Sequence, residues 1–356
     1  MSEPIGRRIA VHRRRRGLSQ AAVAGLVGRS ESWLSQVERG LRGVDSYPVL
    51  RDLARVLRVD ITVLTEAEQA ASHEVCRDVD QHIAAIERAL LVGGGDVDIA
   101  DVQDAVAQAH LDYQAARYDQ VLAALPSLIA AIDGDEAARV AGYTVVAKTL
   151  TKIGTFDLAL VAADRARTAA GSTGDPTDLG MAVYQVVCAL LPTSRAELAE
   201  QLAVASAGQI EVGRQPSEWS VAGALWLIGA VAAARRGDAE AATERLDNAE
   251  SLAIRIGEDA NHRWTAFGPT NVAIHRVSVA VELGDAPAAL KAADSVALDR
   301  LPPGLRSRRV QVQLDIAWAQ AQRRRDAEAL VALLEVERAA PQVTRACPVR
   351  VVTCGR

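Results

Sequence analysis

The feature that most restricts the fold of this chain is a short corner pattern that recurs along its length. The pattern lies at 154–159, 237–242, 284–289 and 325–330, and each copy follows one helical stretch and begins another. Where present, a glycine permits the turn, an aspartate or threonine caps the next helix, and small residues let the partner helix pack closely. The pattern therefore predicts helices stacked in pairs, as in an α-solenoid.

Six helix pairs are predicted from these corners and from the helical stretches between them. Their starts lie near Ile99, Asp135, Pro176, Glu218, Pro269 and Gly304. The spacing of about 36–50 residues is looser than the 34 residues of a tetratricopeptide repeat, yet it belongs to that class. Residues 98–341 therefore resemble divergent tetratricopeptide repeats, whose concave side usually binds ligands. Residues 342–356 are rich in β-branched residues and contain Pro and Gly, so they are predicted to form an irregular tail.

The segment from Leu18 to Arg39 is predicted to form two short helices joined by a tight turn at Gly28. Ser19 and Ser30 each precede a helix, where a hydroxyl can accept hydrogen bonds from unpaired backbone N–H groups. The apolar residues expected to fix the angle between the helices are Ala22, Val23, Leu26, Leu34 and Val37. The outward residues of the second helix are Glu31, Ser32, Ser35, Gln36 and Arg39. Their hydrogen-bonding side chains suit the major groove of DNA.

The distribution of charge places DNA binding at the same end of the chain. Residues 1–65 hold 12 Arg against 6 acidic residues, a net charge of +6, although the whole chain has a formal charge of −5. This leaves 28 basic against 39 acidic residues, a net charge of −11, for residues 66–356. A basic head attracts phosphate and an acidic body repels it. Contact with DNA is therefore expected to be confined to the head.

The first 65 residues carry a specific resemblance. Five helices are predicted there, at 5–16, 20–27, 31–38, 48–57 and 61–64. Three motifs follow in order: Gly-Leu-Ser-Gln at 17–20, Leu-Ser-Gln-Val-Glu-Arg-Gly at 34–40, and Leu-Arg-Asp-Leu-Ala-Arg-Val-Leu at 50–57. Together they resemble the Xre/Cro/C1-type repressor family. The resemblance implies an all-α chain that begins with a lambda-repressor-like five-helix DNA-binding domain at 1–68.

The same resemblance supplies the candidate contacts with DNA. In that family the residue matching Gln20 usually holds the DNA backbone, and the start of the third helix reads the base sequence. With the basic run at 13–16, the candidates are Arg13, Arg16, Gln20, Arg29, Glu31, Ser32, Trp33, Ser35, Gln36 and Arg39. Glu38 and Arg39 match positions that are more often structural or directed at phosphate.

Several of these candidates have two interpretations. The run from Arg13 to Arg16 either clamps phosphate or is a solvated helix end whose cations suit the helix dipole. Trp33 either covers the apolar residues between the helices or contacts the DNA backbone. Glu31 either accepts a hydrogen bond from cytosine N4 or faces away from the DNA.

The head is joined to the body by a segment of different character. Residues 66–91 are predicted to form a helix that opens with a capping box at 65–68. Gly93, Gly94 and Gly95 follow, and three consecutive glycines predict a loop that can serve as a hinge. Residues 69–97 are thus predicted as a connecting helix and glycine loop.

A candidate effector pocket lies in the repeats, because aromatic residues make up only 3% of the chain and cluster there. Its candidate residues are Trp219, Trp226, Asn261, Trp264, Phe267, Asn271 and His275. Apolar area beside amides and an imidazole could bind a ligand, or the tryptophans could fill the core while the polar groups brace the connection at 256–269. Residues 267–276 also resemble a segment of actinobacterial Xre regulators with helical-repeat domains, which implies control of genes by an internal signal.

Other function classes find no support in the sequence. No stretch is judged apolar for long enough to cross a bilayer, and the N-terminus lacks the apolar core of a signal peptide, so a cytoplasmic location is expected. The four cysteines are scattered, and no histidine joins them at metal-binding spacing. No phosphate-binding loop, metalloprotease motif or serine elbow occurs. No metal, cofactor or catalytic residue is therefore predicted.

These observations predict a sequence-specific transcriptional regulator that binds double-stranded DNA as a homodimer. Its repeats are expected to dimerise and to sense a peptide or a small-molecule effector. Two alternatives stay open: a DNA-anchored scaffold that binds a partner protein through its repeats, and an enzyme whose site no motif in residues 98–340 reveals.

Overall fold

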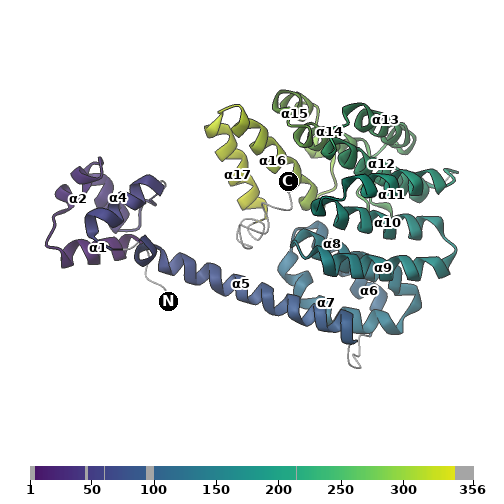
Figure 1. Cartoon of the computed structure of the whole chain (residues 1–356), viewed down its shortest axis with the longest axis horizontal. Helices are drawn as coiled ribbons and strands as arrows, with labels where there is room; N and C mark the ends of the chain where they lie inside the picture. The colour runs from purple at the N-terminus through teal and green to yellow at the C-terminus, as the bar shows by residue number, and fades with distance from the viewer. Residues whose placement is uncertain (1–4, 45–46, 60, 94–99, 214, 341–356) are drawn as a thin grey trace. The chain divides into compact units, whose positions relative to one another are not determined.

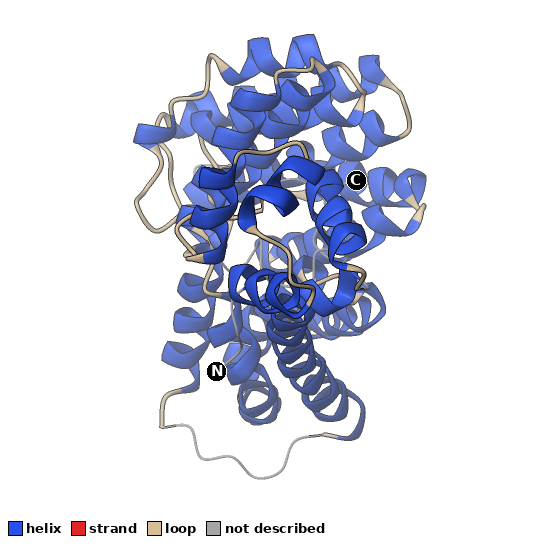
Figure 2. Cartoon of the chain, turned by 90° about the vertical axis from the view of Figure 1, so that its left-hand side faces the viewer, coloured by secondary structure: helices blue, strands red, loops and turns tan. Residues whose placement is uncertain are grey.

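The structure is a computed structural model that describes residues 5–44, 47–59, 61–93, 100–213 and 215–340. Over these residues the regular secondary structure is helical, and no strand occurs among them (Figures 1 and 2). The chain divides into two compact units, Met1–Arg77 and Asp78–Arg356. The predicted all-α class is confirmed.

Four short helices open the first unit. They are α1 (Ile5–Arg15), α2 (Gln20–Leu26), α3 (Glu31–Glu38) and α4 (Tyr47–Leu57). The hydroxyl of Ser19 accepts a hydrogen bond from the backbone N–H of Ala22 at 3.0 Å, and that of Ser30 accepts one from Trp33 at 3.1 Å. Both predicted caps are confirmed, and Gly28 adopts the positive φ of +66° that the turn between α2 and α3 requires.

The core between these helices differs in part from the prediction. Its largest fully buried side chains are Ile9, Leu34, Leu53, Leu57 and Leu64. Val23 and Val37 are buried as predicted, but Ala22 is exposed and Leu26 is 66% exposed. The assignment of Ala22 and Leu26 to the core is wrong. Val23 and Val27, four residues apart, face inward, whereas Ala22 and Leu26 each lie one position earlier and face solvent.

The fifth helix, α5 (Ile61–Val92), corrects two predictions. It has 32 residues, so it does not end at Leu64, and no separate helix begins at the expected capping box. Neither Gly nor Pro, the two residues with the lowest helix propensity, occurs between positions 61 and 92. Nothing of that kind therefore interrupts α5. Gly93, at a φ of +94°, follows its end, while Gly94 and Gly95 of the predicted hinge lie outside the described residues.

The second unit contains an array of helix pairs after α5 (Figure 1). The pairs are α6 (Val102–Gln114) with α7 (Tyr118–Gly134), α8 (Glu136–Lys152) with α9 (Phe156–Thr173), α10 (Pro176–Leu190) with α11 (Ala196–Gln209), α12 (Pro216–Arg235) with α13 (Ala239–Ile256), α14 (Pro269–Glu282) with α15 (Ala286–Ala293), and α16 (Arg306–Gln322) with α17 (Asp326–Ala339). Three short 3-10 helices are η1 (Leu191–Thr193), η2 (His262–Trp264) and η3 (Leu298–Arg300). The described residues thus contain the six predicted pairs, each starting within a few residues of its expected position.

The corners between paired helices follow the predicted capping chemistry at two of the four positions. Asp238 caps α13 through the backbone N–H of Ala241 at 3.0 Å, and Asp285 caps α15 through that of Ala288 at 2.9 Å. Thr155 does not cap α9, because its hydroxyl instead donates to the carbonyl of Leu150, at the end of the preceding helix. Asp326 is the first residue of α17 and does not cap that helix.

The last helix pair packs back against the first. Val310 of α16 and Val336 of α17 share a buried cluster with Ala116 and Tyr118, which lie where α6 ends and α7 begins. Helices α16 and α6 are also in direct contact. The array is therefore closed on itself, and the first helices of its pairs surround a central space.

One helix of the array departs from the expectation about membrane spans. Helix α12 is long and apolar enough to cross a bilayer by length and composition, and it alone passes that test among the described residues. Within the structure, 72% of its apolar window is buried. Its hydrophobic composition is therefore explained by its position in the core of the repeats.

Candidate nucleic-acid interface and effector cavity

The outer face of α3 carries five of the ten predicted DNA contacts. Glu31 and Ser32 are exposed, whereas Trp33, Ser35 and Gln36 are half-buried. These side chains present hydroxyl, amide and carboxylate groups from one short helix. The face has the hydrogen-bonding chemistry that base edges in a major groove can meet.

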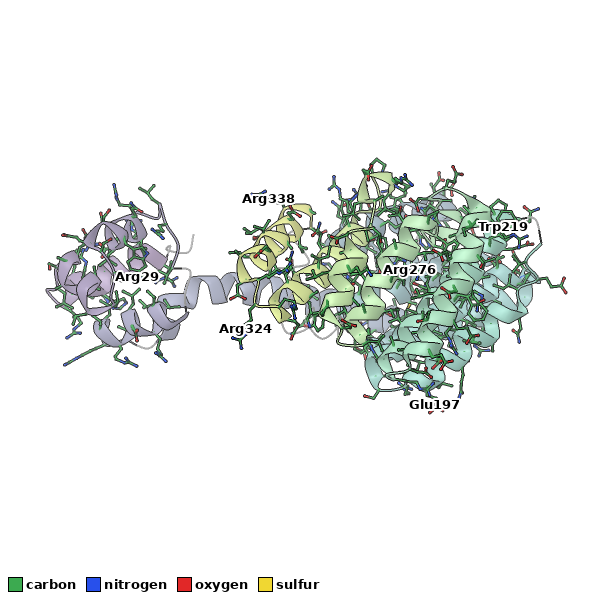
Figure 3. The ribbon with its side chains drawn as sticks, turned by 90° about the horizontal axis from the view of Figure 1, so that it is seen from above. Arg29, Glu197, Trp219, Arg276, Arg324 and Arg338 are labelled. Carbon is green, nitrogen blue, oxygen red and sulfur yellow. The ribbon has the colours of Figure 1, made fainter. Side chains whose placement is uncertain are left out.

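Two arginines flank this face. Arg29, labelled in Figure 3, precedes α3. Its guanidinium lies 5.8 Å from the centre of the Trp33 ring. Arg39 follows α3 and donates from Nε to the carbonyl of Ser35 at 3.2 Å. Both arginines are exposed, so each end of α3 carries a cation that can reach phosphate.

A hydrogen-bonded network under this face joins α1, α2 and α3. Glu38 accepts from Arg13 Nε at 2.6 Å and from Arg13 Nη2 at 2.8 Å, and also from Gln20 Nε2 at 2.6 Å. Arg13 Nη1 donates to the carbonyl of Leu18 at 2.8 Å. Burial opposes ionisation of Glu38, but the hydrogen bonds from Arg13 and Gln20 outweigh it and keep the pKa of this carboxyl lowered.

This network changes how the basic run must be interpreted. The side chain of Arg13 is only 13% exposed and is held by Glu38, so it positions helices. Arg16 donates to the carbonyl of Val56, and Arg14 donates to that of Ala10 at 3.1 Å. Arg14, Arg15 and Arg16 are exposed, and they are the members of the run placed to meet phosphate. The roles of Arg13 and Gln20 toward DNA stay predictions.

A cavity of about 260 Å³ lies in the central space of the repeats. The first helix of every pair contributes to its wall, from α6 to α16, together with residues 264–266. Four cationic side chains line it, against two carboxylates. The cations are Lys148, Lys152, Arg235 and Arg308, and the carboxylates are Glu282 and Asp315.

The two carboxylates already have partners. Glu282 accepts from Arg235 Nε at 2.9 Å in a bidentate ion pair. Asp315 accepts from Ser278 Oγ at 2.6 Å and from Gln311 Nε2 at 3.1 Å. Burial raises the pKa of Asp315 to about 6.

The cationic side of the cavity is built around Lys148. Its ammonium lies 2.6 Å from Nδ1 of His110 and 4.5 Å from the centre of the Tyr113 ring. Because Nε2 of His110 donates to the carbonyl of Ala141 at 3.0 Å, Nδ1 is the acceptor and the imidazole is neutral. Burial, and next the charge of Arg308, hold the pKa of Lys148 well below its usual range.

The segment after α13 crosses this space and forms part of the cavity wall. Asn261 and Gln114 exchange amide hydrogen bonds at 2.9 Å in both directions. The ring of Trp264 stacks on His110 with 4.7 Å between centroids. Arg308 donates to the carbonyl of Thr265 at 3.4 Å. These contacts join the connection between the fourth and fifth pairs to the first and last pairs.

The structure brings together only part of the predicted effector set. Trp264 and His275 line the cavity, and Asn261 contacts the lining residue Gln114. Nδ1 of His275 donates to the carbonyl of Asn271 at 2.8 Å, and burial lowers the pKa of this imidazole to about 3. Asn271 itself is 1% exposed, and its side-chain oxygen has no hydrogen-bond partner among the described residues.

The remaining three residues of that set lie elsewhere. Phe267 is fully buried against Gly223, where a Cβ would stand 2.0 Å from the ring. Trp226 packs against the same core, and Trp219 lies at the edge of the repeats, where its Nε1 donates to the carbonyl of Gly213 (Figure 3). For these three, the interpretation as packing residues agrees with their contacts better than a role in the cavity does.

Sequence reasoning missed the polar residues that dominate the cavity. Several of them are spaced four apart on the first helices of the pairs: Lys148 and Lys152 on α8, Ser278 and Glu282 on α14, and Gln311 and Asp315 on α16. Such i, i+4 pairs share a helix face. Their recurrence on successive first helices was the available signal. No metal-binding group of three His, Cys, Asp or Glu occurs among the residues that were described.

Comparisons with known proteins concern mainly the head. Residues 4–67 match a family model described as a helix-turn-helix domain. Over 64 residues the chain is 39% identical to the HTH-type transcriptional regulator SlrR of Bacillus subtilis strain 168, a match that covers 18% of this chain and 42% of SlrR. Residues 4–67 thus form a helix-turn-helix domain similar to that of a transcriptional regulator. The chain spans less than half the length of this relative.

Two solved structures share a weak likeness to the whole chain. One is Bacillus thuringiensis PlcR in complex with the peptide PapR7 and DNA, with a TM-score of 0.40, 14% identity, and coverage of 82% of this chain and 95% of PlcR. The other is ComR from S. thermophilus in complex with DNA and its signalling peptide ComS, with a TM-score of 0.24, 12% identity, and coverage of 98% and 97%. Likenesses of this strength place no site in this chain.

Proposed function

We propose that this protein is a sequence-specific DNA-binding transcriptional regulator of the cytoplasm. The observation that carries the proposal is the exposed polar face of α3, held by the network of Arg13, Gln20 and Glu38 in a helix-turn-helix domain. The net charge of +6 over residues 1–65 supplies the attraction to phosphate, and α3 supplies the chemistry that distinguishes bases.

The experiment that tests this proposal is selection of bound sites from random double-stranded DNA by the full chain. The expected result is one enriched sequence motif, bound far more tightly than unrelated DNA at the same salt concentration. Enrichment of no motif, with equal affinity for all sequences, would contradict sequence-specific regulation.

We further propose that the protein acts as a homodimer. One small head covers too little DNA for strong specificity, so two heads on inverted half-sites are expected. Helix α17 provides an apolar surface for self-association, since Leu330 and Leu334 are exposed four residues apart. The selected sites should therefore be inverted repeats spaced by about one helical turn or a multiple of it.

The third part of the proposal is that the repeats sense an effector, a peptide or a small molecule. A cavity of about 260 Å³ supports a bound ligand more directly than the alternative of a scaffold that recognises a partner protein. A ligand that binds one conformation of the repeats more tightly would shift the population competent for DNA. The test is whether cell extract depleted of protein changes both the melting temperature and the DNA affinity of the pure chain.

A further inference from the structure

The cavity has the charge of an anion-binding site. Lys148, Lys152 and Arg308 form no ion pair with a carboxylate in the part of the chain that the structure describes. Glu282 pairs with Arg235, and Asp315 is held by Ser278 and Gln311. The wall therefore carries an excess of positive charge, although residues 66–356 as a whole are acidic.

We propose that the cavity binds a small organic anion whose carboxylate or phosphate group lies between Lys148 and Arg308. Its role as the effector rests on the proposed function, whereas its binding does not. The anion would supply the negative charge that the wall lacks. A buried cation without such a partner is unfavourable, and a charged hydrogen bond to a bound anion removes that cost.

The contacts of Lys148 and Arg308 hold them as donors. Lys148 donates one N–H to Nδ1 of His110, and its ammonium lies over the ring of Tyr113. Arg308 interacts with the hydroxyl of Tyr184 and with the carbonyl of Thr265, which leaves other N–H groups of its guanidinium available. Lys148 and Arg308 line the same cavity of about 260 Å³, so a single anion bound there can meet both side chains.

The composition of the chain makes the placement of these lysines informative. The sequence contains 3 lysines, Lys148, Lys152 and Lys291, among 40 basic residues. Two of the three line the cavity, while Lys291 is exposed on α15. Lysine offers a compact charge whose pKa responds to its surroundings, which arginine does not. Its use inside the cavity therefore agrees with a ligand site better than with a solvated surface.

The rest of the wall limits the body of the anion. Tyr113, Tyr184 and Trp264 offer apolar and aromatic area beside the cations. The volume of about 260 Å³ lies just below the range of about 300–1,000 Å³ typical of ligand pockets. A compact anion with a flat apolar body fits these features.

The test measures binding of three matched compounds to the full chain by calorimetry, without DNA. Benzoate carries a carboxylate, phenyl phosphate carries a phosphate, and benzamide has the same ring without charge. One of the two anions is expected to bind about tenfold or more tightly than benzamide, and the tighter one identifies the head group. Equal affinity for benzamide and both anions would overturn the proposal.

Variants assign the binding to the cavity. Lys148→Met and Arg308→Met are each expected to remove the preference for the anion, whereas Lys291→Met should leave it unchanged. Removing Lys148 should also raise the melting temperature of the empty protein, because a buried cation near Arg308 is lost. If Arg308→Met fails to fold, Arg308→Lys keeps a charge and should retain a weaker preference. Normal anion binding by Lys148→Met and by the Arg308 variant that folds would refute the site.

DNA binding by the empty chain separates this inference from the proposed function. If the chain binds the anion but no DNA motif, the function fails and the cavity assignment holds. If it binds its motif normally but shows no preference for an anion, the cavity assignment fails alone.

Discussion

At the scale of single residues, Glu38 joins the first three helices of the helix-turn-helix domain. Its carboxylate binds both Arg13 and Gln20 and is only 6% exposed. A buried carboxylate with a cationic partner fixes geometry, because loss of either group leaves the other without compensation. The orientation of α3 toward DNA therefore depends on a residue that faces the interior.

The first prediction is that Glu38→Gln destabilises the first unit by about 3 kcal/mol, because Arg13 keeps a buried charge without a counter-charge. Hydrogen exchange of the backbone amides in α1 to α3 measures this effect in the full chain. The exposed Glu31→Gln is the matched control and should leave protection unchanged. Equal protection in both variants would mean that the network is incidental.

Gly6 shows a similar dependence at a contact between two backbones. A Cβ at this position would lie 1.9 Å from the carbonyl oxygen of Val37, so α1 packs on α3 without room for any side chain. At Gly25, on α2, no atom of the described residues would lie within 4 Å of an added Cβ. The two glycines therefore differ in physical role although both are in helices.

The second prediction follows from that difference. Gly6→Ala should unfold the first unit or push α1 away from α3, and thereby abolish DNA binding. Gly25→Ala should be neutral or stabilise the domain by about 0.5–1 kcal/mol, because alanine has the higher helix propensity. The measurement is the affinity of each variant for the selected DNA site. Normal binding by Gly6→Ala would disprove the close contact.

At the scale of elements, α3 is where sequence recognition is expected. The third prediction is that Ser35→Ala weakens binding to the selected site by about 1–3 kcal/mol but leaves binding to unrelated DNA unchanged. As a contrast, replacing Arg14 and Arg15 by Gln should weaken binding to all DNA alike and reduce its salt dependence. If Ser35→Ala lowered both affinities equally, α3 would contact only the backbone of the DNA.

How far the sequence predicts each element depends on local signals. The caps at Ser19 and Ser30 and the pair starts at Pro176 and Pro269 were predictable, because cap and proline chemistry act within a few residues. The continuity of α5 past Leu64 was not predicted, although its end at Val92 lies one residue after the predicted end at 91.

The candidate cavity illustrates the same limit over longer distances. Trp264 and His275 were identified from sequence, whereas Lys148 and Arg308 were not. They lie on α8 and α16, and closure of the array brings their helices to one space. Periodicity shows which residues share a face of one helix, but it does not show which faces meet across a ring.

At the scale of the whole molecule, the fourth prediction concerns the homodimer. Leu330→Glu combined with Leu334→Glu should produce a monomer that binds half-sites weakly, because charge replaces the apolar face of α17. Sedimentation of the free protein and of its DNA complex measures this change. Glu328→Gln, on the exposed side of the same helix, should remain dimeric. A parent chain that sediments as a monomer in both states would rule out the proposal.

The last prediction concerns the stability of the repeats at acid pH. Buried histidines lower the free energy of unfolding as pH falls, whereas a buried aspartate raises it. His275 has its pKa lowered to about 3, and the pKa of His110 is also well below its usual value. As pH falls below about 6.5, these histidines become protonated in the unfolded chain but stay neutral in the folded chain. Each histidine therefore lowers the free energy of unfolding by about 1.4 kcal/mol per pH unit. Asp315, with its pKa raised to about 6, offsets part of this loss between pH 6 and 4. Urea unfolding between pH 7.5 and 4.5 should therefore show a shallower loss of stability for His275→Gln and a steeper one for Asp315→Asn. Parallel curves for both variants and the parent would mean that neither group titrates differently in the folded state.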